Sequence, residues 1–323
     1  MYLVVAVEPL GLEESKVRKI FEETLGRYAK LVLYDAPPAD QGELFKRIKD
    51  ADIVVTVSYP ISGEVIRKSE KLKMIAVSFT GYDHVDIEAA KERGIVVSNV
   101  PGYATDSVAE LVFGLVIVAA RRVIQADRVM RTGGWRTPEL LGTELRGKTI
   151  GIVGFGAIGR RVAELAKAFG MDILVYDRSP WKEEKKKKAE EVGARFVSLD
   201  ELMRKSDIVT VHVPLTSETR HMIRYEHLRL LKPGAILVNV ARGAVIKEDD
   251  LVRFLKERKD VTACLDVYSV EPLPPDHELR KLENVILTPH IGFYTKEALE
   301  RRTRVTFENI KAFIEGRPQN RVA

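Results

Sequence analysis

Short apolar runs alternate with amphipathic stretches from the start of the chain. The runs have the length of single strands, and the stretches between them carry apolar residues at helical spacing. Strands are predicted at residues 3–7, 31–34, 53–57, 74–77 and 95–97, and helices before residue 25, near 43–49 and after residue 86. This alternation predicts a parallel sheet covered on both faces, which makes one α/β unit.

The same alternation returns after residue 100 and predicts a second doubly wound unit. A helix within residues 101–123 is apolar almost all round, so we expect it to be buried on most sides. Further strands are predicted at residues 149–153, 173–176, 195–197, 208–213, 235–240, 261–267 and 285–287, with helices between several of them. The last predicted helix, 295–315, has no strand after it, so we expect it to return to the first unit.

A glycine motif follows the strand predicted at residues 149–153. Gly154, Gly156 and Gly159 precede a helical pattern, and the next apolar run ends at Asp177. Such glycines suit a tight turn, a close approach to a pyrophosphate and a close helix–strand contact. A bare turn is the simpler explanation, but strand, glycines, helix, strand and acid in order favour a dinucleotide site. Asp177 would bind a ribose diol and repel a 2′-phosphate, which favours NAD over NADP.

Polar side chains follow three predicted strands of the second unit, where open α/β sheets bind ligands. They are Arg242, Asp266 with Glu271, and His290. Arg242 alone would more often be a surface turn residue, but the set suits hydride transfer between a nicotinamide and a 2-oxo acid. Arginine binds a carboxylate through a planar fork of donors, and an imidazolium can donate a proton to the carbonyl oxygen. Glu271 on the other ring nitrogen of His290 would orient the ring and favour its protonated form.

Four ordered segments carry a resemblance to a known family. VGFGAIGRRVAELAKAFGMDILVYD, NVARGAVIKEDDL, LDVYSVEP and ILTPHIG resemble the signature segments of the D-isomer-specific 2-hydroxyacid dehydrogenases, and TGYDHVDIEAAKERGIVVSNVPGYATDSVAEL also matches. This family of D-2-hydroxyacid dehydrogenases includes glycerate dehydrogenase (hydroxypyruvate reductase), glyoxylate reductase, D-lactate dehydrogenase and phosphoglycerate dehydrogenase. The resemblance implies an α/β fold with two doubly wound parallel-sheet domains. A Rossmann dinucleotide-binding domain, residues 100–289, is expected to be inserted into a flavodoxin-like substrate domain, residues 1–99 and 290–323.

The resemblance also assigns roles at matching positions. His290 would be the acid/base, Glu271 its partner, and Arg242 the clamp on the substrate carboxylate. The backbone amides of Thr80 and Gly81 would help to bind the same carboxylate. The positions expected to line the NAD site are Gly154, Gly156, Ala157, Ile158, Gly159, Asp177, Thr105, Val213, Pro214, Val240, Ala241, Asp266 and His290, with Asp266 on the carboxamide of the nicotinamide. A homodimer is implied, and no metal site is expected.

The resemblance leaves the substrate open. The segment SNVPGYATDSVAEL is similar to glycerate dehydrogenases and favours hydroxypyruvate or glyoxylate. Phe293 and Tyr294 instead resemble the FYT of D-lactate dehydrogenases, where bulky rings could shape the pocket for apolar 2-oxo acids; they could equally pack against the last helix. Phosphoglycerate dehydrogenase is less expected, because no regulatory domain follows residue 323. A rival from another class is an NAD-sensing corepressor-like binding protein, expected to carry extra tails or a partner-binding segment.

Composition narrows the possible partners. The 323 residues carry a formal net charge of +5, with 45% hydrophobic and 31% charged residues, as in a soluble globular protein. The basic run 185–188 is flanked by glutamates, which predicts a solvated helix face rather than a nucleic-acid surface. Cys264 is the only cysteine, so an internal disulfide is excluded, and we expect it to pack as a small hydrophobe.

The apolar stretches are too short for a membrane span. The longest, residues 111–120, falls well below the roughly 20 residues that cross a bilayer. The first residues, MYLVVAVEPLG, lack the basic start and long apolar core of a signal peptide. We therefore expect a cytoplasmic protein without a membrane or nucleic-acid partner.

Overall fold

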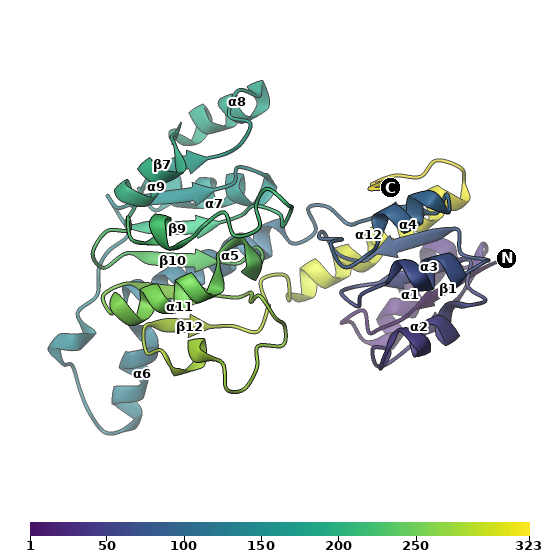
Figure 1. Ribbon diagram of the computed structural model, residues 1–323, viewed down its shortest axis with the longest axis horizontal. Coiled ribbons are helices and arrows are strands. Elements are labelled where there is room, and N and C mark those ends of the chain that lie inside the picture. Colours follow the sequence, from purple (N-terminus) through teal and green to yellow (C-terminus); the bar gives the residue numbers. More distant parts are fainter. The chain divides into compact units, whose positions relative to one another are not determined.

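The computed structural model describes residues 1–323, which form two compact units (Figure 1). Unit 1 consists of Met1–Ala104 and Tyr294–Ala323, and unit 2 of Thr105–Phe293. Each unit contains one sheet in which neighbouring strands run parallel. The predicted α/β fold class, with two parallel-sheet domains, is therefore confirmed.

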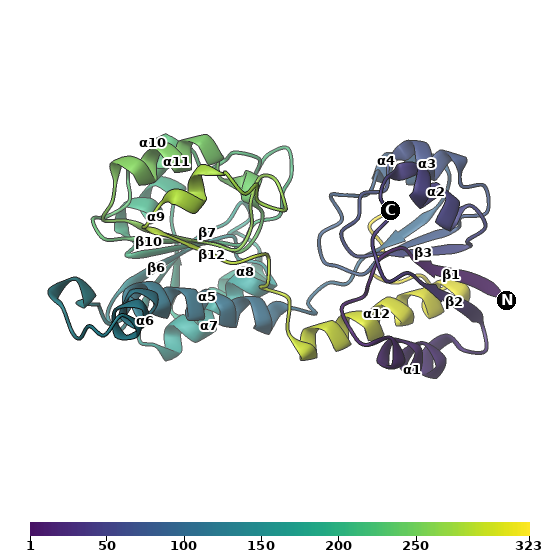
Figure 2. The same ribbon diagram turned by 90° about the horizontal axis from the view of Figure 1, so that it is seen from below.

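Unit 1 has a five-stranded sheet with the order β2-β1-β3-β4-β5, which is the flavodoxin-like order. One face is covered by α2, α3 and α4, and the other by α1 and α12 (Figure 2). The strands are β1 (Tyr2–Ala6), β2 (Ala29–Leu33), β3 (Ile53–Thr56), β4 (Met74–Val77) and β5 (Val96–Ser98). The helices are α1 (Glu14–Leu25), α2 (Gln41–Ile48), α3 (Gly63–Lys68), α4 (Ile87–Glu92) and α12 (Lys296–Ile314).

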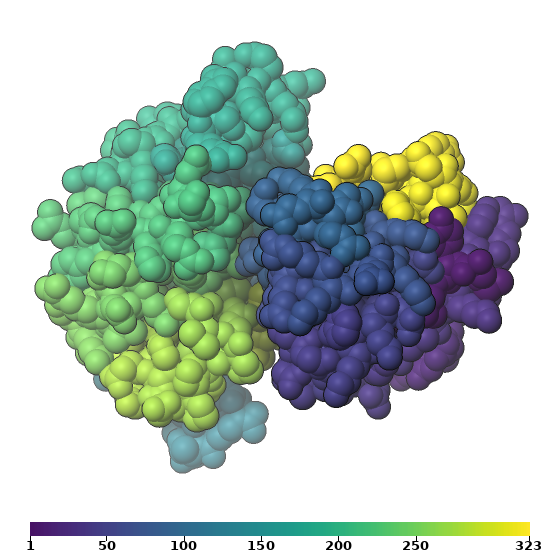
Figure 3. Space-filling model, turned by 45° about the vertical axis from the view of Figure 1, so that its right-hand side comes forward, coloured from purple at the N-terminus to yellow at the C-terminus, as the bar shows by residue number.

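The C-terminal residues complete unit 1. Thr295 caps α12, since its side chain accepts a hydrogen bond from a backbone N–H of the first turn at 3.2 Å. The helix packs against α1 and β4, and the rings of Phe21 and Phe307 meet edge-on with centroids 5.3 Å apart. Beyond α12, the N–H of Val322 donates to the carbonyl of Val97 at 2.8 Å. Figure 3 shows the yellow C-terminal residues beside the purple N-terminal ones.

Unit 2 has a seven-stranded sheet with the order β12-β11-β10-β9-β6-β7-β8. The order reverses at β6, as in a Rossmann sheet. The strands are β6 (Thr149–Val153), β7 (Asp172–Tyr176), β8 (Ala194–Phe196), β9 (Ile208–Val211), β10 (Ile236–Asn239), β11 (Thr262–Leu265) and β12 (Val285–Leu287). The helices are α5 (Thr105–Ala120), α6 (Val123–Arg131), α7 (Ala157–Ala168), α8 (Glu183–Val192), α9 (Leu199–Lys205), α10 (Tyr225–Leu228) and α11 (Glu248–Glu257), with 3₁₀ turns η1 (Pro138–Leu140), η2 (Gly243–Val245) and η3 (Glu278–Lys281).

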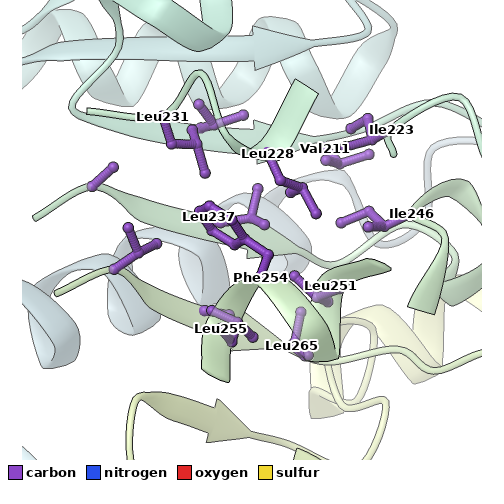
Figure 4. Close-up of a cluster of buried hydrophobic side chains, with 14 of the residues drawn as sticks. Val211, Ile223, Leu228, Leu231, Leu237, Ile246, Leu251, Phe254, Leu255 and Leu265 are labelled. Atoms are coloured by element: carbon purple, nitrogen blue, oxygen red, sulfur yellow. The ribbon is translucent and has the colours of Figure 1, made fainter. Parts of the chain in front are cut away.

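A large apolar core of unit 2 lies between the sheet and the helices α9 to α11 (Figure 4). Leu251, Phe254 and Leu255 repeat at helical spacing, so they share the face of α11 that is buried against the sheet. Leu237 of β10 belongs to the same cluster and is fully buried. This packing fixes α11 against β10, the strand that leads to one of the candidate site loops.

The helices of unit 2 include one that the sequence pattern does not predict. The apolar helix α5 is buried as expected, packed on α7 and against β10 and β11. The helix α6, which packs against α5, has no fully buried residue. None of the helices combines the length and the apolar character that crossing a bilayer requires.

Candidate functional site

The glycine motif forms the turn between β6 and α7. Gly154 has a φ of 100°, and a Cβ there would lie 2.9 Å from the carbonyl carbon of His212. A Cβ at Gly159 would lie 2.1 Å from the carbonyl oxygen of Gly154. At Gly156, by contrast, a Cβ would meet nothing within 4 Å. Two glycines are thus required by the turn and by the helix–strand contact, and the third leaves room for a pyrophosphate at the start of α7.

Asp177 follows β7 and binds the glycine loop. Its Oδ2 accepts a hydrogen bond from the backbone N–H of Phe155 at 2.9 Å. Its Oδ1 accepts from the N–H of Ser179 at 2.8 Å and from the ammonium of Lys185 at 2.6 Å. Burial raises the pKa of this carboxyl, but the bond to Lys185 and the two backbone N–H bonds outweigh it and lower the pKa to about 2. The carboxylate is therefore ionised beside the loop that fits a dinucleotide.

His290 and Glu271 form a pair at the ends of β11 and β12. The Nδ1 of His290 lies 2.6 Å from Oε2 of Glu271, and Oε1 of Glu271 accepts a hydrogen bond from the N–H of Tyr268 at 3.0 Å. Burial raises the pKa of Glu271, but the bond and charge of His290, the Tyr268 N–H and the charge of Arg242 lower it overall. Because an ionised carboxylate only accepts hydrogen bonds, Nδ1 is the donor, and Nε2 is the nitrogen available for proton transfer.

The backbone of His290 is held by Asp266. His290 has a φ of 53°, which is uncommon for a residue other than glycine. The buried carboxylate of Asp266 accepts hydrogen bonds from the N–H groups of Ile291 and Gly292, both at 2.8 Å, and from the hydroxyl of Thr288 at 2.6 Å. Burial raises the pKa of Asp266 despite these bonds. Asp266 thus fixes the loop that carries His290, and its predicted contact with the nicotinamide stays a prediction.

Arg242 follows β10, and a glycine brings its loop close to Glu271. The side chain of Asn239 donates to the carbonyl of Arg242 at 3.0 Å. A Cβ on the next residue, Gly243, would lie 1.9 Å from the carbonyl carbon of Tyr268, so the two backbones touch. The charge of Arg242 contributes to the lowered pKa of Glu271. The sequence argument did not single out Gly243, for which the only signal is a glycine directly after the candidate arginine.

The other predicted cofactor residues lie on neighbouring loops of unit 2. Val213 and Pro214 come after β9, and Val213 is close to the glycine loop, since a Cβ on Gly154 would lie 2.8 Å from its side chain. Ala241 donates its N–H to the side chain of Asn239 at 3.1 Å. Four further positions begin helices or follow a strand: Thr105 at the start of α5, Ala157 and Ile158 at the start of α7, and Val240 directly after β10.

The predicted substrate residues Thr80 and Gly81 belong to unit 1. The hydroxyl of Thr80 donates to the carbonyl of Val100 at 2.9 Å, and its carbonyl accepts from the side chain of Asn99 at 2.7 Å. These bonds fix the segment after β4. The contact of Thr80 and Gly81 with a substrate stays a prediction.

Phe293 and Tyr294 differ in their surroundings. The ring of Phe293 meets the imidazole of His290 edge-on, with centroids 5.7 Å apart and an angle of 85°. Tyr294 is 58% exposed, so packing in the core under the last helix is the wrong interpretation for this side chain. Phe293 thus adjoins the candidate acid/base.

Two further titratable side chains, Cys264 and His212, have pKa values that burial shifts strongly. Cys264 packs as a small hydrophobe, as predicted, and burial raises the pKa of its thiol to about 12. His212 lies with Nε2 2.8 Å from the hydroxyl of Thr210, and burial lowers its pKa to about 3. The structure contains no group of three or more His, Cys, Asp or Glu side chains that could hold a metal ion.

Comparison with known proteins identifies relatives of the whole chain. The family model for the NAD binding domain of D-isomer specific 2-hydroxyacid dehydrogenases matches residues 113–292. The glyoxylate reductase of Thermococcus litoralis is 42% identical over 308 residues, which cover 93% of this chain and 89% of that protein. The D-3-phosphoglycerate dehydrogenase of Methanocaldococcus jannaschii is 45% identical over 276 residues, but these cover 85% of this chain and only 52% of that protein.

Solved structures are similar to the chain over nearly its whole length. An acyclic imino acid reductase in complex with NADPH and D-Arg matches with a TM-score of 0.89 and 32% identity, over 99% of this chain and 100% of that chain. The D-lactate dehydrogenase of Aquifex aeolicus, complexed with NAD and lactic acid, matches with a TM-score of 0.83 and 34% identity, over 97% and 96% of the two chains. The glycine motif fits a dinucleotide, and the family model and the relatives match most of the chain. The chain therefore belongs to the D-isomer specific 2-hydroxyacid dehydrogenase family and is an NAD-dependent oxidoreductase.

Proposed function

We propose that the protein reduces a small 2-oxo acid with NADH, with glyoxylate or hydroxypyruvate as the substrate. The products would be glycolate and D-glycerate. The proposal rests on the hydrogen bond of 2.6 Å between His290 and Glu271. Both residues lie in the unit that contains the glycine motif. The relation to a glyoxylate reductase over most of both chains supports the choice of substrate.

In this proposal His290 is the general acid of the reduction. NADH supplies the hydride that reduces the carbonyl carbon. Glu271 holds the hydrogen on Nδ1 of His290, so Nε2 gives its proton to the carbonyl oxygen as the negative charge develops there. In the oxidation direction the same nitrogen takes the proton from the hydroxyl group. The ionised Glu271 stabilises the imidazolium form in both directions.

Arg242 is proposed to bind the substrate carboxylate and the keto oxygen. Its guanidinium is planar and always charged, which suits both groups. We assign a further part of substrate binding to unit 1, with the backbone amides of Thr80 and Gly81 as donors. Cofactor binding is assigned to unit 2, which contains the family's NAD-binding domain.

The substrate is tested by the rate of NADH oxidation with a panel of 2-oxo acids. The panel consists of glyoxylate, hydroxypyruvate, pyruvate, phenylpyruvate and 3-phosphohydroxypyruvate. The highest kcat/KM is expected for glyoxylate or hydroxypyruvate. If none of the five is reduced while NADH still binds, the proposed activity is wrong.

The role of His290 predicts the effect of replacing it. His290→Gln removes the acid but keeps a polar side chain of similar size, so kcat should fall by about 10²- to 10⁴-fold. NADH affinity, measured by fluorescence titration, should change far less than kcat. As a matched control, His227→Gln alters a half-buried histidine of α10, whose Nδ1 accepts a hydrogen bond from the backbone N–H of Arg224, and should leave kcat near that of the wild type. A His290→Gln variant with wild-type kcat would remove His290 from the mechanism.

Two alternatives within the family are separated by the same panel. Phe293 beside His290 favours D-lactate dehydrogenase activity, because an aromatic ring there suits an apolar 2-oxo acid such as pyruvate. The Methanocaldococcus jannaschii relative favours phosphoglycerate dehydrogenase activity, which would appear as turnover of 3-phosphohydroxypyruvate. The corepressor-like alternative predicts NADH binding without turnover, and the enzymes named above give it no support.

A homodimer is part of the proposal. The helix α6 has no buried residue, and Val123 and Met130 on it are 45% and 54% exposed. Trp135, in the segment after α6, is 72% exposed. A second copy of the chain that covered these side chains would remove their apolar surface from water.

A cytoplasmic location is also proposed. The reaction consumes NADH, and the single buried Cys264 needs no oxidising compartment. Fractionation of the source cells tests this location, which activity in a secreted fraction would contradict.

A further inference from the structure

The carboxylate of Asp177 is crowded with donors. Oδ1 accepts from the N–H of Ser179 at 2.8 Å, from its hydroxyl at 3.0 Å and from the ammonium of Lys185 at 2.6 Å. Oδ2 accepts from the N–H of Phe155 at 2.9 Å. A carboxylate offers about four acceptor positions. A ribose diol, which brings two donors, can therefore add one bond at Oδ2, and a second bond has to displace a donor from Oδ1.

Lys185 is set apart from the other lysines of α8. Its side chain is only 18% exposed, and its ammonium also donates to the hydroxyl of Ser179 at 2.9 Å. The neighbouring Lys186 is 48% exposed and pairs with Glu183 on the same helix at 2.8 Å. The prediction of a solvated helix face for residues 185–188 is thus wrong for Lys185. Its side chain instead binds the segment that follows β7.

The charges around Asp177 nearly cancel. Lys185 balances the carboxylate at a distance of 2.6 Å. The adjacent Arg178 pairs with Glu218 at 2.8 Å, and both side chains are largely exposed. A 2′-phosphate carries a charge of about −1.5 to −2. Asp177 alone would repel it, but the Asp177–Lys185 pair offers it a cation beside a neutralised carboxylate.

We propose that Lys185 determines cofactor specificity and, through its ion pair with Asp177, allows the protein to bind NADPH as well as NADH. With NADH, the ammonium stays on Oδ1 and a ribose hydroxyl donates to Oδ2. With NADPH, the ammonium turns to the 2′-phosphate and forms a charge-assisted hydrogen bond. The inference rests on the cofactor site of unit 2 and does not depend on which 2-oxo acid is reduced.

The test compares NADH and NADPH binding in the absence of any 2-oxo acid. The dissociation constants of both cofactors are measured by fluorescence titration for the wild type, Lys185→Met, Lys185→Arg and the matched control Lys186→Met. Lys185→Met should raise the constant for NADPH about 10- to 100-fold, as expected for the loss of one charged hydrogen bond, and change that for NADH less than about threefold. Lys185→Arg and Lys186→Met should keep the wild-type ratio of the two constants.

Three outcomes would overturn the proposal. They are wild-type NADPH binding too weak to detect, an unchanged ratio in Lys185→Met, and an equal loss of NADPH binding in Lys186→Met, which would point to the general charge of α8. NADH binding by the same variant shows that the variant is folded. The ratio of the NADPH and NADH dissociation constants is therefore not affected by partial unfolding. If Lys185→Met binds neither cofactor, Lys185→Gln removes the same charge and takes its place. Because no substrate is present, a wrong substrate assignment leaves the result unaffected.

Discussion

At the residue scale, Glu271 links the proposed acid to pH. The pKa of Glu271 is lowered in the folded protein, so its carboxylate is ionised throughout the neutral range. A lowered pKa contributes stability above the unfolded value of about 4.3, and this contribution is lost as the pH falls through the folded value. The pair with His290 is thus favourable at neutral pH and is weakened by acid.

Replacing Glu271 should change the pH dependence of the reaction. Glu271→Gln keeps an oxygen that can accept from Nδ1 of His290 but removes the negative charge. We expect kcat for reduction to fall by about 100-fold at neutral pH. Because the charge of Glu271 is lost as the pH falls through its lowered pKa, the ratio of wild-type to variant kcat should shrink toward acid pH.

The control is Glu278→Gln, which removes an exposed carboxylate that pairs with Lys256 and Lys281. Its pH–rate profile should match that of the wild type. A ratio of wild-type to Glu271→Gln kcat that stays constant down to acid pH would show that the charge of Glu271 does not assist the reaction.

At this scale the sequence predicts which site residues lie near one another better than it predicts their individual hydrogen bonds. The proximity of Glu271 and His290 is expected because both follow neighbouring parallel strands, and the structure places them 2.6 Å apart. The bonds of Asp266 to the loop of His290 depend on a left-handed backbone at that histidine, which its sequence does not signal. The pairing of Lys185 with Asp177 depends on how α8 packs beside the glycine loop, which no helical period records.

At the scale of elements, Gly243 joins two loops of the candidate site. It stands at the start of η2, against the backbone of Tyr268, which in turn holds Glu271. A side chain at this position would push η2 away from the segment after β11. The distance between Arg242 and Glu271 therefore depends on the absence of one methyl group.

Gly243→Ala should accordingly damage both stability and substrate binding. A Cβ 1.9 Å from a backbone carbon cannot be accommodated without movement, and we expect the free energy of unfolding to fall by about 1–3 kcal/mol. KM for the 2-oxo acid should rise as Arg242 is displaced. Denaturant unfolding and steady-state kinetics measure the two effects. Gly114→Ala in α5, where a Cβ would meet nothing within 4 Å, should be neutral or stabilising, and equal effects of the two substitutions would contradict the argument.

The elements that the sequence predicts best are those whose pattern has a single interpretation. The apolar runs at 74–77 and 285–287 coincide with β4 and β12. The strand β4 is buried along its length, as expected for an apolar run in a parallel sheet, whereas β12 lies at the edge of its sheet and is half-buried. The pattern does not predict α6, none of whose side chains is fully buried. The short α3 is also missed, although Ser62 caps it.

At the scale of the whole molecule, the exposed apolar side chains of α6 predict the state of association. We expect a homodimer of the wild type, measured by light scattering after size exclusion. The double variant Val123→Glu/Met130→Glu should shift it to a monomer, because two buried charges would oppose association. Val32→Glu, an exposed apolar position on the edge strand of unit 1, should leave the dimer intact. A monomeric wild type, or a dimer that survives the double variant, would contradict the proposed interface.

Unit 1 is assembled from both ends of the chain, and this sets an order of events during synthesis. Residues 1–104 leave the ribosome before α12 exists, so Phe21 and the face of β4 that α12 covers remain open to water. Unit 2 is continuous in sequence and can fold in the meantime. The nascent protein thus carries an unfinished N-terminal unit while its cofactor-binding unit is already complete, and aggregation through this apolar face is the hazard of its biogenesis.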